Sequence, residues 1–405
     1  MRRVVITGIG ILSSIGNNKI EVLKSLINSN SGIVFYPSFM KKGMKSQVCG
    51  NIKIDNKIKI PNKIKRFMSK SAFYAYISMR QAILDSGLDK SMYSKNERVG
   101  IIVSSSSGSP HFYYKGIKNF NKKNKKKISP YILTKAMSSN ISACLSTFFN
   151  IYGISYSISS ACSTSANCIG HSFEQIKNNK QDILFAGGGE EISWELASQF
   201  DSMNSLSRNY NNYPHISSRS YDTKRDGFVI SGGSGIIVLE ELNHAIERKA
   251  KIYAELVSYS SNSDGYHMVI PSFKGIARCI KNAIKKVKIP IDYINTHAAS
   301  TKLGDIVELK AIKKVFKKKI PYISSTKSIT GHSLGVSGVH ELIYSILMLN
   351  NNFISPSINI KNIDLFAKKM NIVTKIKKKK INTILSNSLG FGGSNVALII
   401  KKYIS

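Results

Sequence analysis

Residues 157–176 read SISSACSTSANCIGHSFEQI, and they contain the point where a predicted strand passes into a predicted helix. After the small hydroxylated residues, apolar side chains recur every three to four positions, which is typical of a helix with one buried face. These positions are Ala166, Ile169, Phe173 and Ile176. Ser163 and Thr164 suit the first turn of such a helix. A strand that leads directly into a buried helix indicates an α/β fold.

Short apolar runs that end in glycine or serine recur along the whole chain. The first set comprises RVVITGIG, RVGIIVSSSSG, DILFAGGGEE and GIIVLEE, and the second comprises IYAELVSYS, DYINTHAAS, YISSTKS, TILSNS and NVALIIKK. Helical patterns separate several of these runs, so we expect buried sheets with helices packed on them.

The two sets of strands show one sign of an internal repeat. GGSGIIVLEE from Gly232 resembles GGSNVALIIKK from Gly392, which gives a spacing of 392 − 232 = 160 residues. Glycine pairs before strands are common, so this match alone leaves a duplication open.

Composition bounds the class of protein. The 405 residues are 42% hydrophobic, which allows a sizeable core in one large or two ordinary domains. Lys and Arg number 59 against 23 Asp and Glu, giving a formal charge of +36, so an acidic partner such as nucleic acid is one hypothesis. The lysines lie among asparagines and isoleucines, as in NFNKKNKKK, which also fits codon bias, and no nucleic-acid-binding motif accompanies them.

Cysteine usage and the N-terminus favour a cytoplasmic protein. The five cysteines are an odd number without CxxC pairs, which argues against a disulfide framework and against a zinc ribbon. They are Cys49, Cys144, Cys162, Cys168 and Cys279. The opening apolar stretch is interrupted by Gly8 and Gly10 and predicts a buried strand, not a signal peptide. The next glycine, Gly16, falls outside dinucleotide-binding spacing, and no run of 18 apolar residues predicts a membrane span.

Cys162 is the stronger of the two cysteine candidates in residues 157–176. It lies where the strand meets the helix, so unpaired N–H groups and the helix dipole are expected to lower its pKa and favour the thiolate. Cys168 lies on the buried side of the same helix, where a cysteine behaves as a small hydrophobic side chain.

Two of the eight histidines lie in loops that follow strands, where α/β proteins place their sites. They are His297 in DYINTHAAST and His332 in STKSITGHSLG. By residue type alone each is equally compatible with a structural role. The other six histidines lie in polar loops or on helices and are predicted to be structural or exposed.

Four motifs in one order make the sequence recognisable. SSACSTSA, NTHAASTKLGD, STKSITGHSLGVSG and SNSLGFGGSN resemble the β-ketoacyl-acyl carrier protein synthases over essentially the whole chain. SISSAC, FAGGGEE and RFMS are most similar to the synthase I branch. The resemblance implies a thiolase fold with two duplicated βαβαβαββ halves in five layers, α-β-α-β-α, here divided at residues 1–250 and 251–405, and a homodimer.

The resemblance also implies a reaction. Cys162 would take an acyl chain from acyl carrier protein, with the N–H groups of Cys162 and Phe391 holding the oxyanion. Malonyl-carrier would then lose carbon dioxide, and His297 and His332 would stabilise the enolate. No cofactor or metal is implied. Lys327, with Asp305 and Glu308 of the GDxxE stretch, would orient and tune the histidines; as bare residues, a lysine and its acids more often form a structural ion pair.

Further residues match substrate and carrier positions of the family. Thr301 would contact the pantetheine arm, Phe200 and Met203 would line the acyl tunnel, and Met137 would reach in from the second subunit. Plain core is the alternative for the apolar three. Lys63 and Arg66 match the docking surface for the acidic carrier, and residues 122–127 are a possible extension of it.

Three departures from the family pattern stand out. Ala299 replaces the threonine whose hydroxyl meets the arm, and Leu389 replaces the first aromatic of the glycine-rich loop. SDGYHM from Ser263 is closer to synthase II, so chain elongation of that type stays an alternative.

Other condensing enzymes fit less well. A degradative thiolase needs a second reactive cysteine near the C-terminus, and no cysteine follows Cys279. Synthase III and plant-type polyketide synthases would carry asparagine in place of His332. A chain-length partner would lack Cys162. A basic nucleic-acid-binding protein is the distant alternative.

Overall fold

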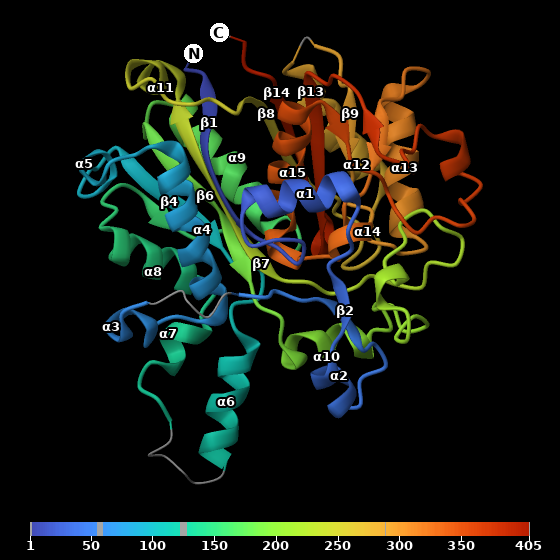
Figure 1. Cartoon of the computed structure of the whole chain (residues 1–405), viewed down its shortest axis with the longest axis horizontal. Coiled ribbons are helices and arrows are strands. Elements are labelled where there is room, and N and C mark those ends of the chain that lie inside the picture. Colours follow the sequence, from blue (N-terminus) through green and yellow to red (C-terminus); the bar gives the residue numbers. More distant parts are fainter. Residues whose placement is uncertain (1, 55–59, 122–127, 288, 405) are drawn as a thin grey trace.

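The computed structural model describes residues 2–54, 60–121, 128–287 and 289–404, and its ten main strands form one continuous mixed sheet (Figure 1). The first five, from the edge inward, are β5 (Ser155–Tyr156), β4 (Val99–Ser104), β6 (Ile183–Glu190), β7 (Gly233–Glu241) and β1 (Val4–Leu12). The second five, again from the edge inward, are β10 (Tyr322–Ser324), β9 (Tyr293–Asn295), β13 (Thr383–Gly390), β14 (Ser394–Lys401) and β8 (Ala254–Ser263).

The two sets of strands have the same pairing. In the first set β4 pairs parallel with β5 and β6, while β6, β7 and β1 pair antiparallel; β9, β10, β13, β14 and β8 repeat this pattern. Gly232 precedes β7, and Gly392 lies in the turn before β14, so the paired sequences found above occupy equivalent places. The predicted duplication is confirmed, whereas the division at residue 250 stays a prediction.

The halves join through an antiparallel contact of β1 with β8, in which Val4 faces Leu256 and Ile6 faces Ala254. Arg3 extends this contact, because its guanidinium donates two hydrogen bonds to Glu255, at 2.9 and 2.7 Å. The two β layers that the resemblance implies are therefore joined by backbone hydrogen bonds into one sheet.

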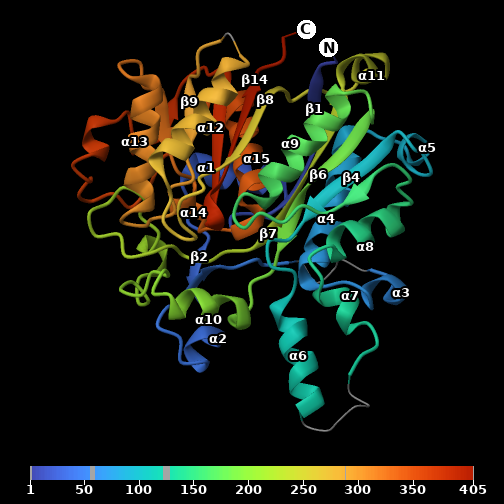
Figure 2. The same cartoon turned by 180° about the vertical axis from the view of Figure 1, so that it is seen from behind.

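Helices complete five layers, as the resemblance implies (Figures 1 and 2). The outer helices on the first half are α4 (Lys70–Ser86) and α8 (Asn140–Phe149), and those on the second half are α12 (Phe273–Lys285) and α13 (Gly304–Phe316). Two helices lie between the half-sheets, α9 (Thr164–Lys177) and α15 (Ser337–Asn351). Nearly every residue of α15 is buried, because it packs on both halves.

The remaining helices are shorter or peripheral. They are α1 (Lys19–Asn28), α2 (Pro37–Lys41), α3 (Asn62–Lys65), α5 (Lys90–Tyr93), α6 (Pro110–Asn121), α7 (Ile132–Ala136), α10 (Trp194–Ser202), α11 (Leu242–Glu247) and α14 (Lys327–Thr330). Two small hairpin-like pairs are β2 (Ile33–Phe35) with β3 (Val48–Gly50), and β11 (Phe353–Ile354) with β12 (Lys377–Lys378). Within the described ranges, no helix has the length and apolar character needed to cross a membrane.

Helix α9 confirms the reading of residues 157–176. It begins at Thr164 with Ser163 as its cap residue, and its predicted apolar face is buried. A Cβ on Gly170 would come within 2.1 Å of the Tyr259 ring, so the lack of a side chain there lets α9 lie close against β8. Cys168 is fully buried, as predicted.

Candidate active site

The turn between β5 and α9 presents Cys162 to a cavity. Ala161, directly before it, has a φ of 51°, in the left-handed region that non-glycine residues seldom adopt. The turn is held by Thr164, whose backbone N–H (3.2 Å) and hydroxyl (2.7 Å) both donate to the Ala161 carbonyl. The nucleophile candidate is therefore on a fixed, tight turn.

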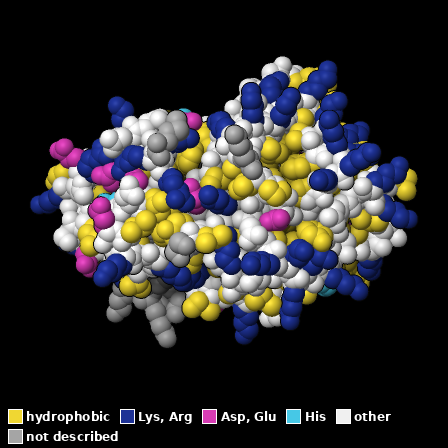
Figure 3. Space-filling view, turned by 90° about the horizontal axis from the view of Figure 1, so that it is seen from above, with side chains coloured by type: hydrophobic (Ala, Val, Ile, Leu, Met, Phe, Trp, Pro, Cys, Tyr) yellow, Lys and Arg dark blue, Asp and Glu magenta, His cyan; other side chains and the backbone are white. Residues whose placement is uncertain are grey.

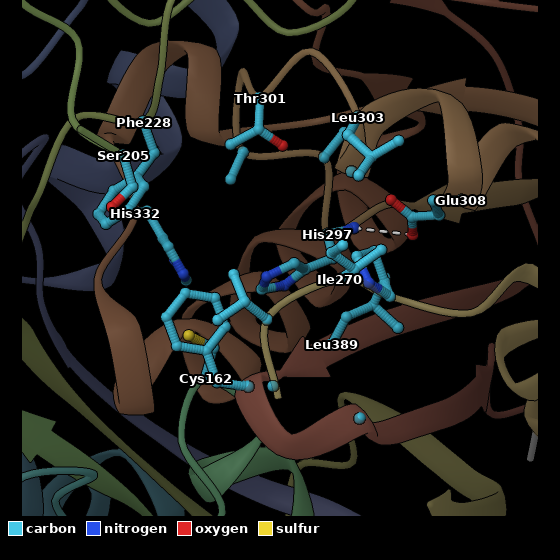
Figure 4. A pocket seen from close by; sticks show the side chains of 18 of the residues that line it. Cys162, Ser205, Phe228, Ile270, His297, Thr301, Leu303, Glu308, His332 and Leu389 are labelled. Carbon is cyan, nitrogen blue, oxygen red and sulfur yellow. Dashed lines mark hydrogen bonds between the residues drawn. The ribbon is translucent and has the colours of Figure 1, made fainter. Parts of the chain in front are cut away.

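A cavity of about 220 Å³ brings together residues from both halves (Figure 4). Cys162 lies at one wall, and His297 and His332 extend toward the same space. The other predicted residues that line it are Phe200, Ala299, Thr301, Glu308, Leu389 and Phe391. Cys162 thus meets residues of the second half that lie 135 (His297) to 229 (Phe391) positions further along the sequence.

The two histidines are in direct contact. Their ring centroids lie 5.0 Å apart with planes at 87°, and a ring nitrogen of each lies within 4.8 Å of the Cys162 sulfur and of the other. His332 Nδ1 is 2.9 Å from the Ser337 hydroxyl, and the His297 backbone N–H donates to Glu308 Oε1 at 2.9 Å. One hydrogen bond therefore fixes the His332 ring, another fixes the His297 backbone, and both histidines line the cavity.

The pKa of the Cys162 thiol differs from the prediction. Burial raises the pKa of the Cys162 thiol to about 12, although the Lys327 ammonium opposes the rise. The predicted lowering is wrong, because the loss of water around the sulfur outweighs the nearby positive groups. Burial, helped by Lys327, also holds the pKa values of His297 and His332 well below their usual range, so both rings are neutral.

Lys327 lies at the start of α14, and only 2% of it is exposed. Its ammonium forms an ion pair with Glu341 of α15. Glu308 accepts hydrogen bonds from the His297 backbone and from Asn387, and Asp305 lies 3.4 Å from Arg225. The ion-pair partner of the lysine is thus Glu341, and the supporting roles of Lys327, Asp305 and Glu308 stay predictions.

Asp305 and Glu308 nevertheless support the site. Asp305 accepts hydrogen bonds from the backbone N–H groups of Thr301 and Tyr221, both at 3.1 Å, and so fixes the loop that carries Thr301. Burial raises the pKa of Asp305 to about 6 and that of Glu308 to about 7. Glu308 fixes the backbone of His297 and also lines the cavity.

The glycine-rich turn between β13 and β14 closes the cavity beside Cys162. A Cβ on Gly390 would lie 2.6 Å from the Ser160 carbonyl oxygen, so this position needs glycine for the turn to reach the nucleophile. Phe391 follows at the cavity wall, with its ring centroid 6.3 Å from that of Phe200. Phe391 and Cys162 thus line the same cavity, and the oxyanion hole formed by their N–H groups stays a prediction.

Four predicted residues lie away from the cavity of this chain. Met203 ends α10 and is 47% exposed, and Met137 follows α7; neither is among the lining residues of the described chain. Lys63 and Arg66 are exposed on and after α3, with the Arg66 guanidinium over the rings of Phe67 and Tyr131. Residues 122–127 lie outside the described residues.

Several residues of the site are not predicted from the sequence, including three with polar or charged side chains. Glu341 lies on a helix with no motif of its own, and Ser205 and His267 line the cavity from loops. His267 had been predicted to be structural or exposed; it is exposed, but at the rim of the cavity. The only local signal was the SDGYHM stretch that departs from synthase I.

Comparison with known proteins agrees with this site. Residues 1–245 match the family described as beta-ketoacyl synthase, N-terminal domain, and residues 253–361 match its C-terminal domain. The 3-oxoacyl-[acyl-carrier-protein] synthases 1 of Buchnera aphidicola subsp. Baizongia pistaciae and Escherichia coli K12 are 58% and 53% identical, over 100% and 99% of both chains. A crystal structure of a beta-ketoacyl synthase from Burkholderia phymatum superposes with a TM-score of 0.95 at 30% identity, over 100% of both chains. The chain belongs to the β-ketoacyl synthase family.

Proposed function

We propose that this chain is a condensing enzyme of fatty-acid synthesis, which joins a Cys162-bound acyl chain to malonyl-acyl carrier protein. The products are 3-oxoacyl-acyl carrier protein and carbon dioxide. The observation that carries the proposal is the convergence of Cys162, His297 and His332 on one cavity of about 220 Å³. Full-length relatives named as synthase 1 support this type of elongation over the synthase II type.

In the first half-reaction Cys162 exchanges one thioester for another. The sulfur bonds to the acyl carbon, the bond from that carbon to the carrier sulfur breaks, and the thiol proton ends on the carrier sulfur. The N–H groups of Cys162 and Phe391 stabilise the oxyanion. A neutral imidazole beside the thiol can accept the proton and pass it to the carrier sulfur, so the ring is neutral again when the step is complete.

In the second half-reaction the bond between malonyl C2 and its carboxyl carbon breaks. Carbon dioxide leaves, and the electron pair remains as an enolate. If the Ser337 hydroxyl donates to His332 Nδ1, the Nε2–H of this ring faces the cavity, and with His297 it donates to the enolate oxygen. C2 then bonds to the acyl carbon, the bond from that carbon to the Cys162 sulfur breaks with its electron pair on sulfur, and the thiolate takes a proton from water to restore the thiol.

The pair of Lys327 and Glu341 acts behind the histidines. Burial lowers the pKa values of both rings, and the ammonium adds to this effect, so the rings stay uncharged and can donate hydrogen bonds to an anionic intermediate. Asp305 fixes the loop that carries Thr301, the predicted contact to the carrier arm. Glu308 fixes the backbone of His297.

Measuring the two half-reactions separately tests the proposed roles of Cys162, His297 and His332. His297→Ala and His332→Ala should each slow malonyl decarboxylation by at least about 100-fold, since each removes a donor to the developing oxyanion. Both variants should retain measurable acylation of Cys162 from an acyl-carrier primer, whereas Cys162→Ala should lose it. Wild-type decarboxylation rates in both histidine variants would refute the two-histidine role.

We also propose a homodimer in the cytoplasm. Both residues of the edge strand β5, Ser155 and Tyr156, are exposed, and an edge strand with free backbone groups favours pairing with a second copy. In a dimer, Met137 and the turn before β5 would lie near the partner's site. The five cysteines are free, which supports a reducing compartment. Light scattering on the purified protein would measure the assembly.

A further inference from the structure

Cys162, His297 and His332 form a set of potential metal ligands as well as a catalytic site. The sulfur and one nitrogen of each ring lie within 4.8 Å of one another. A cysteine sulfur and two imidazoles are ligands that Zn²⁺ prefers, and three protein ligands with an open fourth position are typical of zinc sites that exchange water.

The side chains present ligand atoms in suitable orientations. The Ser337 hydroxyl, 2.9 Å from His332 Nδ1, leaves Nε2 of that ring for a metal and can accept the Nδ1 proton, which is the usual support for a zinc-bound histidine. The backbone of His297 is fixed by Glu308, and its buried Nδ1 has no hydrogen-bond partner in the described chain.

The site needs a modest contraction to hold the ion. With Zn–S of about 2.3 Å and Zn–N of about 2.0–2.1 Å, neighbouring ligand atoms of a tetrahedral site are about 3.4–3.6 Å apart. The present separations of up to 4.8 Å therefore close by about 1 Å, and the cavity leaves space for a water in the fourth position. The Lys327 charge, which would repel a cation, is balanced by Glu341.

We propose that Cys162, His297 and His332 bind one Zn²⁺ reversibly and that the bound ion inhibits the enzyme. On binding, the Cys162 sulfur bonds to zinc, its S–H bond breaks, and the proton leaves to water; no electron is transferred. A sulfur that is bound to zinc cannot attack a thioester. The binding step is independent of the proposed function, whereas the inhibition rests on it.

Metal binding is measured directly on the full chain. After treatment with a chelator, equilibrium dialysis with zinc chloride should give one high-affinity Zn²⁺ per chain. Cys162→Ala, His297→Ala and His332→Ala should each weaken binding by more than the 10- to 100-fold that loss of an outer-shell partner costs. Co²⁺ in place of Zn²⁺ should give a thiolate-to-cobalt absorption band that is absent from Cys162→Ala.

Matched variants test the location of the ion. Cys168→Ala removes a buried cysteine on α9, and His267→Ala removes an exposed histidine at the cavity rim; both should bind Zn²⁺ as the wild type does. Retained binding in Cys162→Ala, or loss in either control, would overturn the site.

Activity gives the second readout. Zinc chloride should inhibit condensation in proportion to occupancy, and a chelator should restore the rate. Full activity at full occupancy would overturn the inhibition. A chain that binds zinc but shows no condensation in the presence of chelator would instead count against the proposed function.

Discussion

At the scale of single residues, Cys162 shows how opposing effects set the state of a nucleophile. The start of α9 and the Lys327 ammonium both favour the thiolate. Burial of the sulfur favours the thiol and is the larger effect, so the pKa is raised to about 12. We conclude that the resting enzyme holds a thiol, which loses its proton during acyl transfer.

This state predicts the pH dependence of alkylation. Below a pKa of about 12 the thiolate fraction of Cys162 grows about tenfold per pH unit, so its rate with iodoacetamide should rise steadily from pH 6 to about pH 9. Burial also raises the pKa of Cys168 to about 12, and its sulfur is inaccessible, so Cys162 should be labelled first. Peptide mapping measures both rates. A plateau near pH 7, or earlier labelling of Cys168, would contradict this assignment.

A second residue-scale prediction concerns Ala299, which lines the cavity beside Thr301. The family's threonine hydroxyl is missing here, and a neutral hydrogen bond contributes about 0.5–1.5 kcal/mol, equivalent to about 2- to 13-fold in binding. Ala299→Thr should lower KM for malonyl-carrier within this range and leave kcat nearly unchanged, because the arm is held in ground and transition states alike.

The control for this change is Ala299→Val, which has the shape of threonine without its hydroxyl. It should not lower KM, and Ala299 packs near Phe228 and Leu206, so thermal unfolding of both variants reports whether the larger side chain fits. An unchanged KM in a folded Ala299→Thr, or an equal fall in Ala299→Val, would show that the arm takes another path.

At the scale of elements, the site depends on contact between two turns from different halves. The β13–β14 turn lies against the β5–α9 turn at Gly390, where an added Cβ would be 2.6 Å from the Ser160 carbonyl oxygen and 3.4 Å from Ala161 Cβ. The proposed oxyanion hole takes one N–H group from each of these turns. Their spacing is therefore part of the catalytic geometry.

Gly390→Ala tests this contact. Its φ of −106° suits alanine, so the effect arises from the contact alone, and the turns must separate. A misplacement of about 1 Å costs on the order of 100-fold, so we expect a loss of this size in kcat with a folded protein. In the control, Gly87→Ala at the end of α4, φ is 66° and the added Cβ meets nothing; it should lower stability by about 1 kcal/mol and leave kcat unchanged. A kcat for Gly390→Ala within twofold of wild type would contradict the argument.

At the scale of the whole molecule, basic residues far outnumber acidic ones, with 59 Lys and Arg against 23 Asp and Glu. On the face that Figure 3 shows, Lys and Arg side chains are spread out, with fewer Asp and Glu among them. This face therefore fits a general compositional bias better than a dedicated nucleic-acid site. Local docking of an acidic carrier near α3 stays a prediction.

Charge reversal tests that docking. Lys63→Glu with Arg66→Glu should raise KM for the acyl carrier several-fold at low salt, because both side chains are exposed beside α3. The difference should vanish at about 1 M salt, where the screening length is about 3 Å. Steady-state kinetics at several salt concentrations measures both effects.

The matched control reverses two lysines on the opposite half. Lys313→Glu with Lys314→Glu on α13 changes the net charge equally, and both side chains are exposed. An equal rise in KM would indicate a non-specific effect of net charge, and an unchanged KM in the α3 variant would place docking elsewhere.

Local features, and through its motifs the family, can be predicted from the amino-acid sequence without the structure. The three- to four-residue spacing after Cys162 predicted α9, and the repeated glycine-strand pattern at Gly232 and Gly392 marked equivalent strands of the two halves. Periodicity and strand-end motifs are local properties, so they can be read without knowing what packs where. His297 and His332 were selected in this way.

Which groups meet, and how much water they lose, follow from the three-dimensional packing and not from local sequence. The structure assigned Glu341 to Lys327, placed Met203 at the surface, and showed that burial raises the pKa of Cys162. Ion pairing and desolvation depend on side chains that are far apart in the sequence, because distant segments enclose each group. A helix start can be predicted from neighbouring residues, but the exclusion of water from its first turn is a property of the whole fold.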